Sequence, residues 1–368
     1  MVGMLKDTLQ LARDMVAGGQ LPNMQGSECP ARGSNLGDLE ARTDQPNSHP
    51  FWRCTADGCR ARLLVTRNTW ADVRLPLQQV AGLGWPFSHR FAPGPLSPRD
   101  CALILGCAVK GANRAFNALL DNVGEYVTRE QKKIVLKGQC ESDGVYPRSF
   151  RNRQGDLVHL RAWGAMRRGD PKSVVLYPLK EKPIHKATGG SPPPCTVAEV
   201  SALMRKHMPT GSDHRVDVYH SDGEQVYRNL PTHREFTKKQ FRTQVRHTPT
   251  KGKDGRRTME FTALKKFKLK NGKTLLVWGG TQAADGRWAH LRKALPRGLR
   301  LKKASDRALL WKWARVWQWQ SWASKQPMWT ELGRLLGSLQ RSGAVANVGG
   351  RGVLRVRNAP LEKVRHRR

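Results

Sequence analysis

Three aspartates lie at positions where a carboxylate could bind a metal ion. Asp222 lies just after the run 215–220, in which β-forming residues alternate, and Gly223 then breaks that pattern. Asp143 follows a β-like segment upstream, and Asp285 opens a predicted helix downstream. Carboxylate oxygens are the hard ligands that Mg²⁺ prefers. The pattern therefore predicts an acidic metal site, although three unrelated surface aspartates would look the same.

The predicted elements from residue 133 onward follow an order that brings two of these aspartates together. Three strands, a helix, a fourth strand and a short helix are expected at 139–143, 157–163, 173–179, 196–204, 215–222 and 225–230. Thr196 and Glu199 form the Thr-x-x-Glu capping box that starts a helix. Such an order opens a ribonuclease-H-like sheet, in which the first and fourth strands are neighbours. The sequence thus predicts an α/β fold with a mixed, ribonuclease-H-like sheet flanked by helices, where Asp143 meets Asp222.

The third aspartate opens a helix predicted over 285–295, which Pro296 ends. Asp285 and Arg292 share one face of this helix and lie two turns apart, roughly 10 Å along its axis. One nucleotide step could span that distance. The alternative is an acid that only complements the helix dipole.

The charge of the chain predicts a polyanionic partner. The 368 residues carry a net charge of +36, which favours nucleic acid over an anionic membrane. About half of that charge lies in residues 227–303. Within them, basic and apolar residues alternate before a hairpin turn, and the lysines concerned are Lys265, Lys266, Lys268 and Lys270. We expect these lysines to follow DNA phosphates, although a charge run is often only a solvated face.

Three cysteines near the N-terminus have the layout of a zinc ribbon. Cys29 precedes a proline, and Cys54 and Cys59 follow after a gap. Structural zinc requires four ligands, yet Arg32 stands where a second thiolate is expected, and His49 is the one remaining candidate. The sequence therefore predicts a degenerate ribbon that binds zinc poorly. Seven cysteines spread along the chain also favour a reducing compartment over a disulfide framework.

A helical unit follows the ribbon and resembles a helix-turn-helix. Ser97 and Asp100 form a capping box, and a glycine turn separates that helix from a second one at 109–123. Lys110 and Arg114 lie one turn apart on the second helix, which favours DNA contact. A plain helical hairpin is the alternative.

The sequence predicts five segments in all. They are an N-terminal helix and loop at 1–28, the degenerate ribbon at 29–70, the helix-turn-helix-like unit at 71–130, the ribonuclease-H-like domain at 133–300 with a basic insertion at 232–273, and a tryptophan-rich helix with a basic tail at 301–368. Core packing rather than base stacking is expected of the tryptophans. Neither a membrane span nor a signal peptide is expected, so the protein is predicted to be intracellular.

This order of parts resembles the ISXO-type DDE transposases of bacterial insertion sequences. The family motif Glu-x-Asp matches Glu141-Ser142-Asp143, and its second motif matches Asp222, Tyr227 and Leu230. Its third motif, His-Thr-Asn-x-Ile-Glu-Gly-x-Trp-x-x-Leu-Lys, follows the spacing of residues 281–292. Gln282, Asp285 and Arg292 replace the Asn, Glu and Lys of that motif. The resemblance covers roughly residues 29–300.

The resemblance implies DNA cleavage and strand transfer with two Mg²⁺ ions, for which Mn²⁺ can substitute. It implies that Asp143 and Asp222 share the metals, that Asp285 binds one of them, and that Arg292 and Lys293 hold terminal phosphates. The implied partners are transposon ends and target duplex, with a homo-oligomer on DNA left open. The compartment would be the nucleus of a eukaryote or the nucleoid of a bacterium. Two alternatives remain, namely a transposon-derived DNA-binding protein without catalysis and a basic RNA-binding protein.

Overall fold

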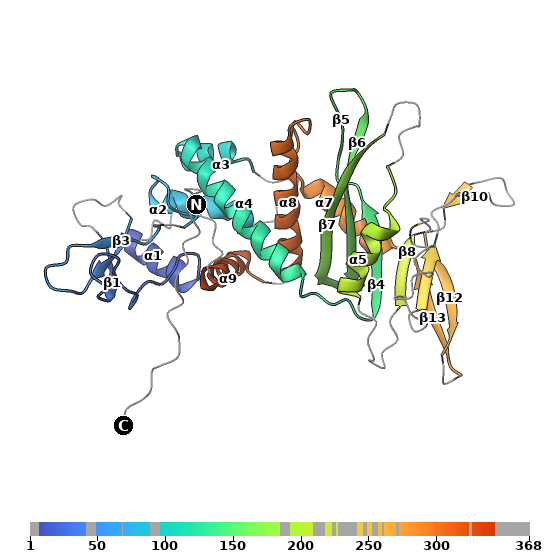
Figure 1. The fold of residues 1–368 in the computed structure, drawn as a ribbon, viewed down its shortest axis with the longest axis horizontal. Coiled ribbons are helices and arrows are strands. Elements are labelled where there is room, and N and C mark those ends of the chain that lie inside the picture. Colours follow the sequence, from blue (N-terminus) through green and yellow to red (C-terminus); the bar gives the residue numbers. More distant parts are fainter. Residues whose placement is uncertain are drawn as a thin grey trace. The chain divides into compact units, whose positions relative to one another are not determined.

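The computed structural model describes residues 7–41, 49–67, 69–88, 96–184, 192–208, 218–222, 226, 241–245, 249–251, 257–259, 261–269, 272–323 and 326–342 (Figure 1). The chain divides into two compact units. One consists of Met1–Tyr126 with Lys325–Arg368, and the other of Val127–Ser324. Most of the helix predicted at 225–230, Lys270 and the basic tail lie outside the described residues. No helix of the described part is long and apolar enough to cross a membrane.

The first unit combines a small antiparallel sheet with helices. Its elements are α1 (Thr8–Ala17), β1 (Leu36–Glu40), β2 (Phe51–Cys54), β3 (Arg62–Leu64), α2 (Leu77–Ser88), α3 (Pro98–Leu105), most of α4 (Val109–Gln131) and α9 (Met328–Arg341). Strand β3 ends at Leu64, before the end of the predicted ribbon segment. The Thr69 hydroxyl donates to the Thr66 carbonyl at 2.7 Å and closes a turn there.

The two helices of the predicted helix-turn-helix-like unit are present. Ser97 and Asp100 form both hydrogen bonds of a capping box at the start of α3. Gly106 ends α3 in the left-handed conformation, with φ 61°, which a glycine adopts without strain. Helix α4 then begins at Val109, and Lys110 and Arg114 are both exposed on it.

The second unit is built on a six-stranded mixed sheet of β4 (Gln139–Val145), β5 (Ser149–Arg151), β6 (Leu157–Arg167), β7 (Asp170–Ile184), β8 (Val218–Asp222) and β9 (Phe241–Val245). Strand β6 pairs antiparallel with β4, β5 and β7. Strands β8 and β9 extend the sheet on the other side of β4, and both pairings are parallel. The expected mixed sheet is therefore present, and so is the expected pairing of its first and fourth long strands.

Helices cover both faces of this sheet. Helix α5 (Val197–His207) packs Val200 and Met204 against Cys140, Trp163 and other buried side chains of one face. Helix α7 (Gln282–Ala294) contacts β4 and β6 on the opposite face, where Glu141 and Gly164 project. The sheet thus lies between two layers of helix, as an α/β fold requires.

Helix α8 (Ala304–Trp322) protects the free edge of β7, beside which it lies in Figure 1. An edge strand presents unpaired backbone groups that must be covered. Trp322 and Gln318 both donate to the Val174 carbonyl, at 2.8 and 3.1 Å, and Arg315 donates to the Leu176 carbonyl at 2.7 Å. Trp313, Trp317 and Trp319 are buried, so core packing is confirmed for these tryptophans. Helix α8 belongs to the sheet unit, whereas α9 belongs to the first unit.

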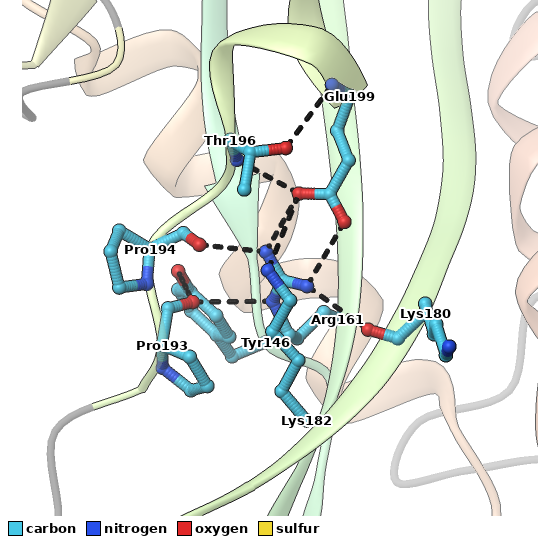
Figure 2. Close-up of polar contacts among 8 residues, drawn as sticks. All are labelled: Tyr146, Arg161, Lys180, Lys182, Pro193, Pro194, Thr196 and Glu199. Atoms are coloured by element: carbon cyan, nitrogen blue, oxygen red, sulfur yellow. Dashed lines mark hydrogen bonds and ion pairs between the residues drawn. The ribbon is translucent and has the colours of Figure 1, made fainter.

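A buried arginine fixes the segment that leads into α5 (Figure 2). The Arg161 side chain is fully buried on β6, and its guanidinium donates to the carbonyls of Pro193, Pro194 and Lys180 at 3.2, 2.8 and 3.0 Å. The same guanidinium donates to both carboxylate oxygens of Glu199, at 3.3 and 3.1 Å. Glu199 also completes the predicted capping box with Thr196. Five acceptors therefore compensate the buried charge and tie the start of α5 to the sheet.

This network predicts an acid-sensitive stability difference between the protein and Glu199→Gln. Burial raises the pKa of Glu199, but hydrogen bonds from Arg161 and Thr196 outweigh it and leave the pKa below the ordinary 4.5. A lowered pKa stabilises the folded state above the ordinary pKa, and the stabilisation is lost as the pH falls through the folded-state value. Urea unfolding should show Glu199→Gln less stable at neutral pH, with the difference shrinking below pH 4.5. A difference independent of pH would contradict the network.

Candidate functional site

The strand register places Asp143 and Asp222 at the same level of the sheet. Strands β4 and β8 run parallel, and they pair Gln139 with Val218, Cys140 with Tyr219 and Glu141 with His220. Two residues further along both strands, the same register brings Asp143 level with Asp222. Neighbouring strands lie about 4.8 Å apart, and both aspartates are half-buried. The two carboxylates therefore project from adjacent strands on one face.

Helix α7 begins over the same face and carries the third aspartate. Glu141 precedes Asp143 by two residues, so both side chains leave the same face of β4. The Glu141 carboxylate accepts the Ala284 amide of α7 at 2.7 Å. Asp285 is the next residue of α7, is half-buried, and accepts the Thr281 hydroxyl at 3.2 Å. The three predicted aspartates thus belong to two adjacent strands and the helix above them.

The start of α7 differs from the prediction, because the helix begins at Gln282 rather than at Asp285. Its first-turn amide at Ala284 is satisfied by Glu141, which is distant in sequence, and Thr281 makes no side-chain capping bond. A carboxylate at a helix N-terminus is favourable because the amides there lack intrahelical partners. The one local capping signal is Thr281, whose hydroxyl donates to Asp285 instead of accepting a backbone amide.

A glycine in the neighbouring strand lets α7 lie flat on the sheet. Gly164 of β6 pairs directly with Asp143. A Cβ atom at Gly164 would collide with the indole ring of Trp288, which is 1% exposed. Leu291, one turn along α7, is fully buried as well. The contact between Trp288 and Gly164 thus fixes how closely α7 approaches the sheet next to Asp143.

A buried ion pair ties β4, α7 and the segment before α7 together. The Glu141 side chain is 1% exposed, and it accepts the Arg168 Nε at 2.5 Å. Arg168 also donates to the carbonyls of Trp278 and Gly280, at 2.5 and 2.7 Å. Trp278 lies in β13 (Thr274–Gly279), and Gly280 lies between β13 and α7. One guanidinium therefore links both β13 and the residues before α7 to Glu141 of β4. We call Glu141, Arg168 and the Ala284 amide the Glu141 clamp.

A neutral histidine lies beside the clamp. His220 is fully buried on β8, level with Glu141, and its Nδ1 is 2.7 Å from the Thr243 hydroxyl oxygen. Its Nε2 is buried and has no hydrogen-bond partner among the described residues. Burial, with a smaller contribution from the Arg168 charge, lowers the pKa of His220 to about 3. The imidazole is therefore uncharged at neutral pH and adds no positive charge to the carboxylate face.

The donor atoms on this face fit a hard divalent cation. Carboxylate oxygens from Asp143, Asp222 and Asp285 are the ligand type that Mg²⁺ and Mn²⁺ take. Among the described residues, the three aspartates are not one of the groups of side chains that lie close enough together to hold a metal ion; the cysteine group described below is such a group.

The predicted phosphate contacts occupy exposed positions in both units. Arg292 and Lys293 are exposed in the last turn of α7. Lys265, Lys266 and Lys268 are exposed on β12 (Ala263–Lys268), which pairs with β13, and Lys270 lies outside the described residues. In that hairpin, Lys266 pairs with Leu276, and Leu264 pairs with Trp278. The hairpin face thus combines lysines with Trp278, which is 60% exposed.

The predicted cysteines gather at one end of the small sheet in the first unit. The sulfur atoms of Cys29, Cys54 and Cys59 lie within 4.8 Å of one another. His49 does not join them, because its Nδ1 is 2.6 Å from the Thr66 hydroxyl and its Nε2 is 2.5 Å from the Leu75 carbonyl. The set of three thiols without a fourth ligand does not fit the closed tetrahedron of structural zinc.

Sequence reasoning missed two residues of the carboxylate face. His220 precedes Asp222 by two residues, so strand periodicity alone could have placed it on the same face. Arg168 carried no such signal, because it stands among other basic residues at the turn between β6 and β7. Its role depends on bonds to Trp278 and Gly280, which lie far away in sequence.

Neither a protein-family model nor a curated protein nor a solved structure matches this chain. The register of β4 and β8 and the contacts of α7 therefore carry the functional assignment. All of these residues belong to one compact unit, Val127–Ser324.

The Glu141 clamp predicts that Glu141→Ala loosens α7. Removing one partner of a buried ion pair costs about 3–5 kcal/mol, because the other charge stays buried. Urea unfolding should show such a loss, and amide hydrogen exchange should accelerate in the first turn of α7. The matched control is Glu181→Ala, which breaks a more exposed pair with Arg307 at 2.9 Å and should cost no more than about 1 kcal/mol. Equal losses in both variants would contradict the clamp.

Proposed function

We propose that the protein is a DDE-type transposase-like enzyme that binds DNA and catalyses metal-dependent cleavage and strand transfer, with the second unit as a ribonuclease-H-like catalytic domain. The observation that carries this proposal is the parallel register of β4 and β8, which puts Asp143 level with Asp222 beneath the helix that bears Asp285. The resemblance to ISXO-type transposases assigns catalysis to the same three residues.

The strand arrangement supports the ribonuclease-H-like assignment. Four antiparallel strands come first, a helix follows, and two further strands then add in parallel on the other side of β4. The sequence anticipated three of the strands before the helix and the strand that pairs with the first one. It did not anticipate β5 or β9, and β9 lies within the predicted basic insertion 232–273. The arrangement brings together residues 79 positions apart (222 − 143) without any local sequence signal.

Asp143, Asp222 and Asp285 would hold Mg²⁺ or Mn²⁺. When bound, a pair of such ions activates water or a 3′-hydroxyl and stabilises the leaving oxygen of a phosphodiester. Asp143 and Asp222 orient their oxygens from adjacent strands, and the Glu141 clamp sets the position of Asp285. The neutral His220 adds no positive charge that would oppose a cation there.

Charge and exposure support DNA as the substrate. The lysines of β12 and the basic end of α7 flank the carboxylate face on elements that Arg168 and Glu141 hold in place. Phosphates that approach the acidic residues would otherwise be repelled. In the first unit, Lys110 and Arg114 offer exposed cations on α4. Transposon ends and target duplex are the proposed partners, bound by one chain or by a homo-oligomer.

One observation favours a second candidate, a transposon-derived DNA-binding protein that has lost catalysis. Asp285 is one methylene shorter than the glutamate of the related motif, and its Oδ2 already accepts a bond from Thr281. A shorter side chain retracts its oxygens from the metal positions, and metal sites tolerate little displacement. The RNA-binding alternative has only the net charge in its favour.

We predict that Asp222→Asn abolishes Mg²⁺-dependent DNA nicking and leaves metal-free duplex binding equal or slightly tighter. Asp222 repels phosphates when no metal is present, so its neutralisation cannot weaken that binding electrostatically. Filter binding and a nicking assay on the same preparations measure both effects, with Asp170→Asn as the matched control. Full nicking by Asp222→Asn would refute the catalytic assignment. A wild-type protein that binds DNA but never nicks it would favour the non-catalytic candidate.

The reciprocal control replaces Lys265, Lys266 and Lys268 with glutamine. These residues should act through phosphate neutralisation, so binding should weaken and the slope of log K against log salt should flatten by about 0.9 for each phosphate that is no longer neutralised. Nicking at saturating protein should persist, because the carboxylates are untouched. Tighter binding to structured RNA than to duplex DNA would instead favour the RNA-binding alternative.

A further inference from the structure

Two turns of the same shape carry the two buried thiols of the cysteine group. Cys29 and Cys54 are each followed, four residues later, by a glycine in the left-handed conformation, with φ of 72° at Gly33 and 71° at Gly58. Backbone amides inside each turn hydrogen-bond the sulfur, and they belong to Ala31, Arg32 and Ala56. Groups that hold a ligand atom in place prepare it for metal binding.

Metal binding at this group would release protons. Thiolates rather than thiols bind metal ions, so an ion that enters the group displaces the thiol protons to solvent.

No fourth His, Cys, Asp or Glu side chain joins the group among the described residues. In each turn, the place of a second thiolate is taken by an exposed charged residue, Arg32 or Asp57. The third sulfur comes instead from Cys59, which is half-buried while the other two cysteines are buried. His49 is held by Thr66 and Leu75. The group therefore supplies three preformed ligands and leaves the fourth coordination position for a ligand from outside the protein.

We infer that Cys29, Cys54 and Cys59 form a three-thiolate metal site that takes a thiophilic ion such as Zn²⁺ together with one exchangeable, non-protein ligand. Thiolates select soft and borderline ions, and a site with three protein ligands keeps its fourth position available. Three thiolates exceed the charge of a divalent ion by one. The exposed guanidinium of Arg32 lies in the same turn and complements that excess. The inference is independent of the proposed catalysis.

The test loads the full-length, reduced protein with Co²⁺ and with Cd²⁺ under anaerobic conditions. The site should bind one ion per chain, with thiolate-to-metal charge-transfer bands, and added imidazole should shift the Co²⁺ visible spectrum by entering the open position. Cys59→Ser should lose the bands, whereas Cys107→Ser, which removes a thiol outside the group, should keep them. A Co²⁺ spectrum that imidazole leaves unchanged, or the absence of any binding, would overturn the inference.

Arg32→Cys provides a gain-of-function test. A thiolate at that place would supply the missing ligand and close the tetrahedron. The variant's Co²⁺ spectrum should no longer respond to imidazole, and its Zn²⁺ should leave to a chelator more slowly than that of the wild type. If the wild type already holds its Zn²⁺ as tightly as Arg32→Cys does, a fourth protein ligand is present and the open site is refuted.

Discussion

The second unit depends on one buried side chain. The Glu141 carboxylate accepts hydrogen bonds from the Arg168 guanidinium and from the Ala284 amide. Burying a carboxylate is costly unless donors replace its water, and here a guanidinium and a helix N-terminus do so. The same Arg168 binds two carbonyls of the segment before α7. The strand with Asp143, the helix with Asp285 and the lysine-bearing hairpin are therefore positioned together, so that a change at Glu141 reaches all three.

Local signals predicted helix starts in both units, and long-range contacts account for what was missed. The capping boxes at Ser97 and Thr196 predicted correct helix starts, because the side chain that caps lies within one turn of the amide it satisfies. Helix α7 starts at an amide capped by Glu141, which is remote in sequence, so its first turn was missed. The pairing of β4 with β8 followed from element order alone. No periodicity could reveal Arg168.

The two units separate two kinds of metal-ligand chemistry. The carboxylate face offers hard oxygen donors, and the cysteine group offers soft sulfur donors within 4.8 Å of one another. If both proposed sites take ions, hard ions such as Mg²⁺ and thiophilic ions such as Zn²⁺ would partition between them by ligand type. Removal of an ion from one proposed site should then leave the other occupied.

The catalytic proposal depends on one question, namely whether a divalent metal ion binds between Asp143, Asp222 and Asp285. Anomalous diffraction from crystals of the protein soaked in Mn²⁺ tests this directly, because manganese is located without reference to activity. We predict anomalous peaks between the carboxylates of Asp143 and Asp222, within coordination distance of Asp285, and their loss in Asp222→Asn crystals. Manganese bound only elsewhere, or peaks that persist in Asp222→Asn, would contradict the proposal.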